Sequence, residues 1–363
     1  GVEIIFGYPG GAVLTLYDAL YRADFPHILT RHEQGAVHAA DGYARATGNV
    51  GVCFATSGPG ATNLVTGIAT AYMDSVPLVA ITGQVGVSFI GKDSFQEADI
   101  CGITTPITKH NYLVKRVQDL PRILKEAFYI ARTGRPGPVI VDVSKDVLNA
   151  AFDYHYPETV ELRGYKPLYD GSAEKIDAAV AALAQAKKPL VFVGGGVNLS
   201  DTSESLRQVV LAAKTPVISS LMGLGCIPAD WPQHLGMVGM HGSYAANIAV
   251  TECDLLLAVG ARFDDRVISV AKHFAPKARI VHFDIDPAEV NKNIRCDIRV
   301  IGDLRWSLPL LSEKTAQSRT NDTWADTTAW MEQVLRWKAE KTPAGNPAAG
   351  TDVPRVVIEK IAA

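Results

Sequence analysis

The chain has 363 residues, of which 47% are hydrophobic and 20% charged, and its formal net charge is -3 at pH 7. This length and composition predict a globular protein of two or three domains and exclude a fibrous or disordered chain. A small negative charge gives no general attraction to phosphate backbones or anionic membranes, so we expect neither nucleic acid nor a membrane as a partner.

The five cysteines are widely spaced and form no Cys-x-x-Cys pair, so we expect neither a zinc site nor a disulfide framework. Buried thiols in a reducing cytoplasm are the simplest interpretation. No apolar run approaches the roughly 18 residues of a membrane span, and no signal peptide is evident. The chain opens at Gly1 almost directly before an apolar run and ends at Ala363 within another. We therefore expect a fragment of a longer protein.

Residues 1–150 alternate short apolar runs with helical patterns. Continuous runs of Val, Ile and Ala are typical of strands buried on both faces of a parallel sheet. Strands are predicted at 2–6, 27–30, 51–56, 78–82 and 139–143, and helices at 12–23, 36–47 and 61–74. The clearest helix begins at Asp119, has Pro121 in its first turn and ends at Gly134. This alternation predicts an α/β doubly wound domain over 1–150.

The stretch 151–171 contains several Tyr and Pro residues, follows neither period and is predicted to be a linker. A second α/β domain is predicted over 172–315, with a helix at 173–186 and strands at 189–193, 215–219, 254–259 and 279–283. The segment 316–352 is predicted to hold one helix, at 324–341, and a Pro/Gly/Ala linker near 342–350. Residues 353–363 are interpreted as the start of a third domain.

Glu33 lies between two glycine-proline turns, at 7–11 and 57–63. One interpretation is an acid in the first turn of a helix, which the helix dipole favours. However, ligands of an α/β sheet bind beyond the carboxyl ends of its strands, and all three segments leave strands at that edge. Glycine lets backbone approach a ligand closely, because it has no Cβ. Glu33 is therefore a candidate for holding a flat heterocycle and protonating one of its nitrogens.

Other patterns are less specific. Lys109 and His110 could form a solvated surface pair, and the loop 260–266, with two acids and two arginines, could hold only salt bridges. No GxGxxG fingerprint is present, and the glycine turns 194–196 and 222–225 are each compatible with simple strand exits.

Seven motifs follow one another in order: GYPGG (7–11), RHEQ (31–34), SGPGATN (57–63), GQV (83–85), IGKDSFQE (90–97), TKHNY (108–112) and GRPGP (134–138). This order closely resembles the catalytic subunit of acetohydroxyacid synthase, also called acetolactate synthase, in the thiamine-diphosphate-dependent superfamily. The resemblance implies a pyrimidine-binding domain for thiamine diphosphate over 1–150 and a Rossmann-like FAD-binding domain over 172–315. It extends over the whole chain.

The implied reaction decarboxylates pyruvate on thiamine diphosphate. The two-carbon unit, formally a hydroxyethyl carbanion, is joined to pyruvate or 2-ketobutyrate, giving 2-acetolactate or 2-aceto-2-hydroxybutyrate for valine, leucine and isoleucine synthesis. The alternatives are a pyruvate oxidase or decarboxylase, a catabolic FAD-free acetolactate synthase, and a non-catalytic FAD-binding scaffold. The 90–97 run and Arg266 favour the carboligase, which must grip the carboxylate of a second ketoacid.

By resemblance, Glu33 hydrogen-bonds the aminopyrimidine ring of the cofactor. Residues that line the active site are Phe95, Gln96 and Lys109, while Arg266 holds the carboxylate of the second ketoacid. The other residues implied for thiamine diphosphate come from the two glycine turns: Tyr8, Pro9, Gly10, Gly11, Pro59 and Asn63. The cofactor is the electron sink, and the protein orients it and manages protons.

The resemblance also implies a structural FAD, since the net reaction transfers no electrons. Its implied contacts are Arg135, Gly194, Gly195, Gly196, Met240, His241, Gly242, Arg262, Asp284, Asp286 and Asp303. Family members hold Mg²⁺ with a Gly-Asp-Gly motif that is missing here, because Leu304 follows Gly302 and Asp303. We therefore expect no metal ligand in this chain and place the Mg²⁺ ligands in the third domain. A cytoplasmic homodimer with shared active sites and a small regulatory subunit is implied.

Overall fold

The computed structural model describes residues 1–268, 270–320 and 324–340. The chain divides into two compact units, Gly1–Pro167 and Leu168–Ala363. This boundary falls inside the stretch 151–171, for which a linker is expected. The linker expected near 342–350 and the third-domain segment 353–363 lie outside the described residues.

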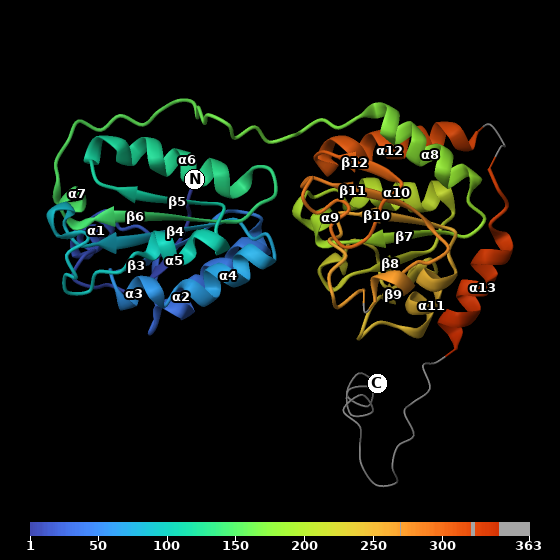
Figure 1. Ribbon diagram of the computed structural model, residues 1–363, viewed down its shortest axis with the longest axis horizontal. Coiled ribbons are helices and arrows are strands. Elements are labelled where there is room, and N and C mark those ends of the chain that lie inside the picture. The colour runs from blue at the N-terminus through green and yellow to red at the C-terminus, as the bar shows by residue number, and fades with distance from the viewer. Residues whose placement is uncertain (269, 321–323, 341–363) are drawn as a thin grey trace, which may run out of the picture. The chain divides into compact units, whose positions relative to one another are not determined.

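Each unit is built on one six-stranded parallel sheet (Figure 1). The strand order is β2-β1-β3-β4-β6-β5 in the first sheet and β12-β11-β10-β7-β8-β9 in the second. The predicted fold class, two doubly wound parallel α/β sheets, is confirmed. The strands are β1 (Ile5–Gly7), β2 (His27–Leu29), β3 (Gly51–Ala55), β4 (Leu78–Gln84), β5 (His110–Val114), β6 (Pro138–Ser144), β7 (Pro189–Val193), β8 (Val217–Ser219), β9 (His234–Met237), β10 (Leu255–Val259), β11 (Arg279–Asp284) and β12 (Ile298–Ile301).

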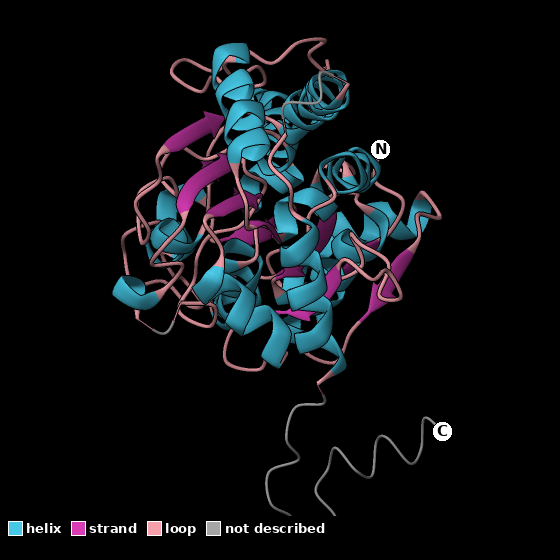
Figure 2. Ribbon diagram, turned by 90° about the vertical axis from the view of Figure 1, so that its right-hand side faces the viewer, coloured by secondary structure: helices cyan, strands magenta, loops and turns pink. Residues whose placement is uncertain are grey.

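Helices alternate with the strands along both units (Figure 2). In the first unit α1 and α6 pack on one face of the sheet, and α2, α4 and α5 pack on the other. The α-helices are α1 (Leu14–Arg22), α2 (Glu33–Thr47), α3 (Pro59–Thr62), α4 (Val65–Met73), α5 (Ile100–Thr104), α6 (Leu120–Arg132), α7 (Lys145–Asn149), α8 (Ala173–Gln185), α9 (Gly195–Leu199), α10 (Ser203–Ala213), α11 (Tyr244–Glu252), α12 (Leu304–Arg319) and α13 (Thr328–Ala339).

The helix predicted to begin at Asp119 is α6, with Pro121 in its first turn as expected. The carboxylate of Asp119 makes no capping hydrogen bond, however. Ile123, Ala127 and Ile130 recur at helical spacing and are buried against β6. The apolar period therefore determines this helix more than its cap does.

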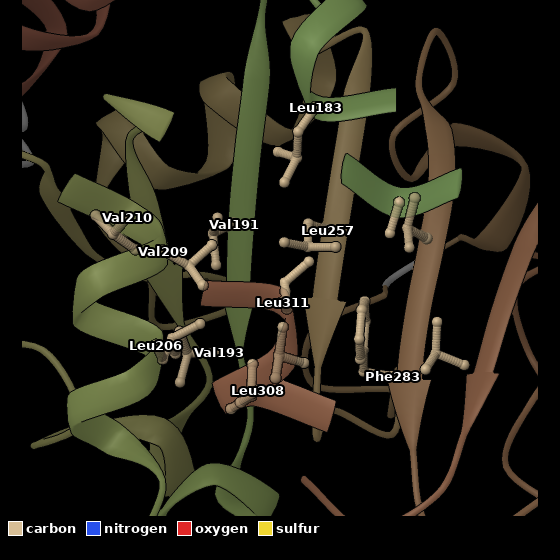
Figure 3. Close-up of a cluster of buried hydrophobic side chains, with 14 of the residues drawn as sticks. Leu183, Val191, Val193, Leu206, Val209, Val210, Leu257, Phe283, Leu308 and Leu311 are labelled. Carbon is tan, nitrogen blue, oxygen red and sulfur yellow. The ribbon is translucent and has the colours of Figure 1, made fainter. Parts of the chain in front are cut away.

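The second unit has a hydrophobic cluster on each face of its sheet, and one of them lies between β7, β10 and β11 and the helices α8, α10 and α12 (Figure 3). Side chains from both layers converge there: Leu183, Val191, Val193, Leu206, Leu257, Phe283, Leu308 and Leu311. Helix α12 runs across residue 315, the predicted end of the second domain. Its charged residues are exposed or half-buried, while Leu304, Leu308 and Leu311 anchor it to the core. Three small polar residues are buried beside these leucines: Ser307, Ser312 and Thr315.

Nine of the strands and α-helices were not predicted: β5, β9, β12, α5, α7, α9, α10, α11 and α12. The three strands have only four or five residues each, and each contains polar side chains. Such strands lie at or near the edges of the two sheets, where one side meets solvent and a continuous apolar run is not required. The helix predicted at 324–341 is α13, and the strand predicted at 2–6 is β1.

Candidate active site

The first sheet reverses its strand order beside β1, because β2 pairs with one side of β1 and β3 with the other. The carboxyl ends of β1 and β3 lead into the glycine turns 7–11 and 57–63. The backbone N–H of Ala12 donates to Oγ1 of Thr56 at 3.2 Å, which ties the two turns together. Doubly wound sheets bind ligands at such a switch point.

Glu33 is the first residue of α2, and α2 directly follows β2 at this edge. The helix begins here because His32 is extended and its Nδ1 accepts a hydrogen bond from the backbone N–H of Gln34 at 3.1 Å. The Glu33 side chain is buried, and its Oε2 accepts a hydrogen bond from Nδ2 of Asn63 at 3.0 Å. Among the described residues no donor bonds Oε1. One carboxylate oxygen is therefore held by the protein and the other remains for a ligand.

The loop 85–99, between β4 and α5, meets the second glycine turn. Gly58 has a φ of +59°, and a Cβ there would lie 2.7 Å from the carbonyl oxygen of Gln96. Only glycine permits both this conformation and this approach. Phe95 is 89% exposed beside Gln96. The structure thus brings Glu33, Asn63, Phe95 and Gln96 to one edge of the first sheet.

Lys109 lies at the opposite edge of the same sheet. It directly precedes β5, and its backbone N–H donates to the carbonyl of Pro138, at the start of β6, at 2.8 Å. Its ammonium donates to the carbonyl of Ile130, and to that of Thr133 at 2.7 Å. Those carbonyls end α6, where a cation is favoured by the helix dipole. The structure does not bring Lys109 to Glu33.

A lysine at the Glu33 edge is Lys145, which sequence analysis missed. It is exposed and opens α7 directly after the carboxyl end of β6. The next residue, Asp146, accepts a hydrogen bond from the backbone N–H of Val87 at 3.1 Å, so α7 contacts the start of the loop 85–99. The signal was available, because a basic residue follows a predicted buried strand, 139–143, after a single serine.

A buried carboxyl group, that of Asp142, lies in β6 two residues before the carboxyl end of the strand. It accepts hydrogen bonds from Thr82 at 2.6 Å and from Gln84 at 3.0 Å, both in the adjacent strand β4. Burial raises the pKa of Asp142 to about 7. Asp142 was not among the predicted site residues, because it stands within an otherwise apolar strand.

The second sheet has its own switch point between β7 and β10. The glycine turn 194–196 follows β7, and the loop 260–266 follows β10. The backbone N–H of Gly196 donates to the carbonyl of Gly260 at 3.0 Å, and a Cβ on Gly196 would lie 2.8 Å from the Gly260 Cα. This contact between two backbones requires glycine on both sides.

Met240 is tied to the 260–266 loop, since its N–H donates to the carbonyl of Arg266 at 2.9 Å. The Arg266 guanidinium lies 3.4 Å from the Asp265 carboxylate, with both side chains more than two-thirds exposed. Such a pair contributes little to stability and leaves the guanidinium accessible. Arg262 is half-buried in the same loop, and His241 and Gly242 directly follow Met240.

Acidic residues at the ends of β11 and β12 form hydrogen bonds and ion pairs with residues close to them in the fold. The carboxylate of Asp284 accepts a hydrogen bond from the N–H of Asp286 at 2.8 Å, and it lies 3.6 Å from the buried His282. Burial lowers the pKa of His282, but hydrogen bonds with Asp284 and Cys296 outweigh this and raise it to about 9. Asp303 caps α12 and pairs with Arg305 at 2.7 Å.

Large apolar side chains remain exposed near the glycine turn of the second unit. Leu221, Met222, Leu224 and Met240 are each more than two-fifths exposed. A Cβ on Gly195 would lie 2.9 Å from the Met222 Cβ, so the 221–224 segment borders the turn. Exposed apolar groups beside close-packed glycine backbone form a surface that suits a flat apolar ligand. Arg135 lies in the first unit, where its Nε donates to Oγ of Ser75 at 2.8 Å.

Within the described ranges no group of three or more His, Cys, Asp or Glu side chains could hold a metal ion. None of the helices in that part of the chain is long and apolar enough to span a lipid bilayer. All five cysteines are free thiols.

Two family models match the chain. The "Thiamine pyrophosphate enzyme, N-terminal TPP binding domain" matches residues 1–103, and the "Thiamine pyrophosphate enzyme, central domain" matches residues 176–311. Together they cover about two thirds of the chain.

The similar proteins are named as large subunits of acetolactate synthase. The chain is 54% identical over 347 residues to a probable acetolactate synthase large subunit of Methanocaldococcus jannaschii, covering 94% of this chain and 58% of that protein. It is 49% identical over 368 residues to the acetolactate synthase large subunit of Haemophilus influenzae, covering 99% and 63%. It is 47% identical over 364 residues to the isozyme 3 large subunit of Escherichia coli, also covering 99% and 63%. The chain thus spans about three fifths of these relatives' length.

Proposed function

The chain belongs to the thiamine pyrophosphate enzymes as a homologue of acetolactate synthase large subunits, and on this basis we propose that its parent protein is an acetolactate synthase. The reaction decarboxylates pyruvate and joins the two-carbon unit to pyruvate or 2-ketobutyrate. It serves the synthesis of branched-chain amino acids. The observation that carries the proposal is a buried glutamate with one free carboxylate oxygen at the switch point of the first sheet.

Glu33 binds and orients the aminopyrimidine ring of thiamine diphosphate in this proposal. Asn63 holds Oε2, so Oε1 can exchange a proton with a ring nitrogen. The turns 7–11 and 57–63 support the ring with open backbone, through Tyr8, Pro9, Gly10, Gly11 and Pro59. When bound, thiamine diphosphate supplies the electron sink for decarboxylation.

Phe95 and Gln96 border the entrance for the substrate, because their loop lies on the Gly58 turn. Lys145 offers an accessible cation at the same edge for the carboxylate of pyruvate. Lys109 is left out of this role, since α6 holds its ammonium.

Arg266 holds the carboxylate of the second ketoacid, because an exposed guanidinium can grip a carboxylate through two hydrogen bonds. A structural FAD binds the carboxyl edge of the second sheet. The exposed apolar residues there suit its ring, and the glycine turn 194–196, the 240–242 segment, Arg262, Asp284 and Asp286 suit the rest of the cofactor. Asp303 is a weaker candidate, because Arg305 occupies its carboxylate. Arg135 remains a further proposed FAD contact.

The proposal extends to Mg²⁺, a homodimer, a small regulatory subunit and a cytoplasmic location. The large-subunit names of the relatives support a small subunit. The described residues offer no metal cluster, so Mg²⁺ and the diphosphate would be held by other residues of the parent protein.

The test uses the full-length gene product with pyruvate, thiamine diphosphate, Mg²⁺ and FAD. We expect acetolactate, measured after acid conversion to acetoin, and its loss when thiamine diphosphate is omitted. Oxygen consumption or acetaldehyde without acetolactate would instead identify an oxidase or a decarboxylase. A full-length protein that binds FAD but consumes no pyruvate would be a scaffold.

A further inference from the structure

The loop 85–99 is held together by hydrogen bonds between its own residues. Within it the Glu97 carboxylate accepts hydrogen bonds from the N–H of Gly91 and from the N–H of Ser94, the latter at 3.0 Å. Oγ of Ser94 donates to the carbonyl of Phe89 at 2.9 Å. Because these bonds join the loop to itself, its position depends on bonds to groups outside it. In one such bond the N–H of Val87 donates to Asp146, and others lie at the two ends of the loop.

Gln84, the last residue of β4, bonds both ends of this loop. Its Oε1 accepts a hydrogen bond from the N–H of Val85 at 2.9 Å. Its Nε2 donates to the carbonyl of Ala98 at 2.8 Å and to Oδ2 of Asp142 at 3.0 Å. The carboxamide therefore has each of its groups bonded, and Asp142 determines which way it faces.

Asp142 is suited to this role because its carboxyl group is buried and fixed. Its other oxygen, Oδ1, accepts a hydrogen bond from Thr82, which is directly opposite it in the sheet. The charged or titratable groups that act on it electrostatically come from the covering segment 99–101, namely Asp99 and Cys101. Losing Gln84 would leave a buried carboxyl oxygen unbonded, which a protein tolerates poorly.

We propose that Gln84 and Asp142 are positioning residues that anchor both ends of the loop 85–99 and so hold Phe95 and Gln96 against the Gly58 turn. The anchoring of the loop follows from the hydrogen bonds of Gln84 and Asp142. Its effect on substrate entry rests on the proposed function, in which the loop 85–99 borders the entrance to the active site. Neither residue touches substrate in this account.

The test measures amide hydrogen exchange of the peptide 85–99 in the full-length protein. Gln84→Met keeps the side chain's length but removes every hydrogen bond, and Asp142→Leu removes both acceptors. We expect roughly tenfold faster exchange in this peptide for both variants, with the β3 peptide unchanged. Asp142→Asn retains an oxygen for Gln84 and can offer its amide to Thr82, so it should restore exchange to within about threefold of the wild type.

Tyr112→Phe is the matched control, because it deletes a side-chain bond to Glu126 at 2.9 Å on the helix α6 that covers the opposite face. It should leave the 85–99 peptide unchanged. Equal acceleration in Tyr112→Phe, or no acceleration in Gln84→Met, would overturn the proposal.

Steady-state kinetics separate the two claims. If the enzyme makes acetolactate, Gln84→Met should raise the KM for pyruvate severalfold while kcat changes by less than about twofold. A fall in kcat with an unchanged KM would overturn the positioning role. If the wild type makes no acetolactate while the loop still loosens in Gln84→Met, the anchoring is supported and the proposed function fails.

Discussion

The carboxamide of Asn63 donates a hydrogen bond to Oε2 of Glu33 at 3.0 Å, across 30 residues of sequence. Asn63 follows the short helix α3, and Glu33 opens α2, so the bond joins segments that leave two different strands. It fixes the rotation of the carboxylate. Oε1 then has a defined direction from which to meet a ring nitrogen, which is the basis for the role proposed for Glu33.

Glu33→Gln should therefore lower turnover of the full-length enzyme by roughly 10²–10⁴, the range for losing a general acid–base group. The amide has nearly the same shape but cannot exchange a proton with a ring. Initial rates of acetolactate formation at saturating cofactor measure the effect. Glu126→Gln, at another buried acid, is the control and should leave turnover within a few-fold of normal. Near-normal activity in Glu33→Gln would remove Glu33 from the mechanism.

Much of the edge of the first sheet that holds Glu33 could be predicted from the sequence, because each of its turns and strand ends has a short sequence pattern of its own. Glycine-proline turns after apolar strands mark both the strand ends and the open backbone, and Glu33 follows the strand between them. The long central strands were predictable for the same reason, since a strand buried on both faces is a continuous apolar run.

The placement of Lys109 could not be predicted, because β5 was not. The polar residues His110 and Asn111 interrupt the apolar run that would predict this strand. Because β5 begins at His110, Lys109 directly precedes it and lies at the amino edge of the sheet. The Gln84–Asp142 bond was equally hidden, because it depends on the register between two strands 58 residues apart.

Lys109→Met should lower stability and leave catalysis largely intact. The substitution removes an ammonium that bonds the carbonyls of Ile130 and Thr133 at the end of α6, and losing such bonds costs about 1–2 kcal/mol. Thermal melting of the full-length protein and the KM for pyruvate measure the two effects. The exposed Lys115→Met serves as the control for melting, and Lys145→Met, at the Glu33 edge, should raise the KM instead. A large loss of turnover in Lys109→Met with normal melting would restore Lys109 to the active site.

Asp142→Asn should flatten the pH dependence of stability in the first unit. Burial raises the pKa of Asp142 from 3.8 to about 7, so the folded protein holds this proton more tightly than the unfolded chain. Stability contributed by the protonated form is complete below about pH 4 and is lost as the pH rises through about 7. The variant has no such proton to lose.

Amide exchange of the β6 peptide 138–144 between pH 5 and 8, corrected for intrinsic rates, measures this stability. The tryptophans cannot report it, because all five lie beyond residue 230. Wild-type opening should become easier as the pH rises, and Asp142→Asn should show a smaller slope. The same slope in both proteins would contradict a raised pKa at Asp142.

Arg266→Ala should harm carboligation more than decarboxylation. The accessible guanidinium is proposed to grip the second ketoacid, which enters only after pyruvate has lost carbon dioxide. The ratio of acetolactate formed to carbon dioxide released should fall. Arg299→Ala, at another exposed arginine, should not change this ratio. An equal loss in both steps would argue that Arg266 acts elsewhere.

Glu33 is proposed to exchange a proton with the aminopyrimidine ring of bound thiamine diphosphate, and this exchange should promote loss of the proton at the thiazolium C2. Hydrogen–deuterium exchange at the thiazolium C2 of thiamine diphosphate, bound to the full-length protein and followed by proton NMR, tests it without any substrate. Glu33→Gln should slow this exchange by at least roughly 10² relative to the wild type, with the cofactor still bound. Equal exchange rates in the two proteins at full cofactor occupancy would contradict it.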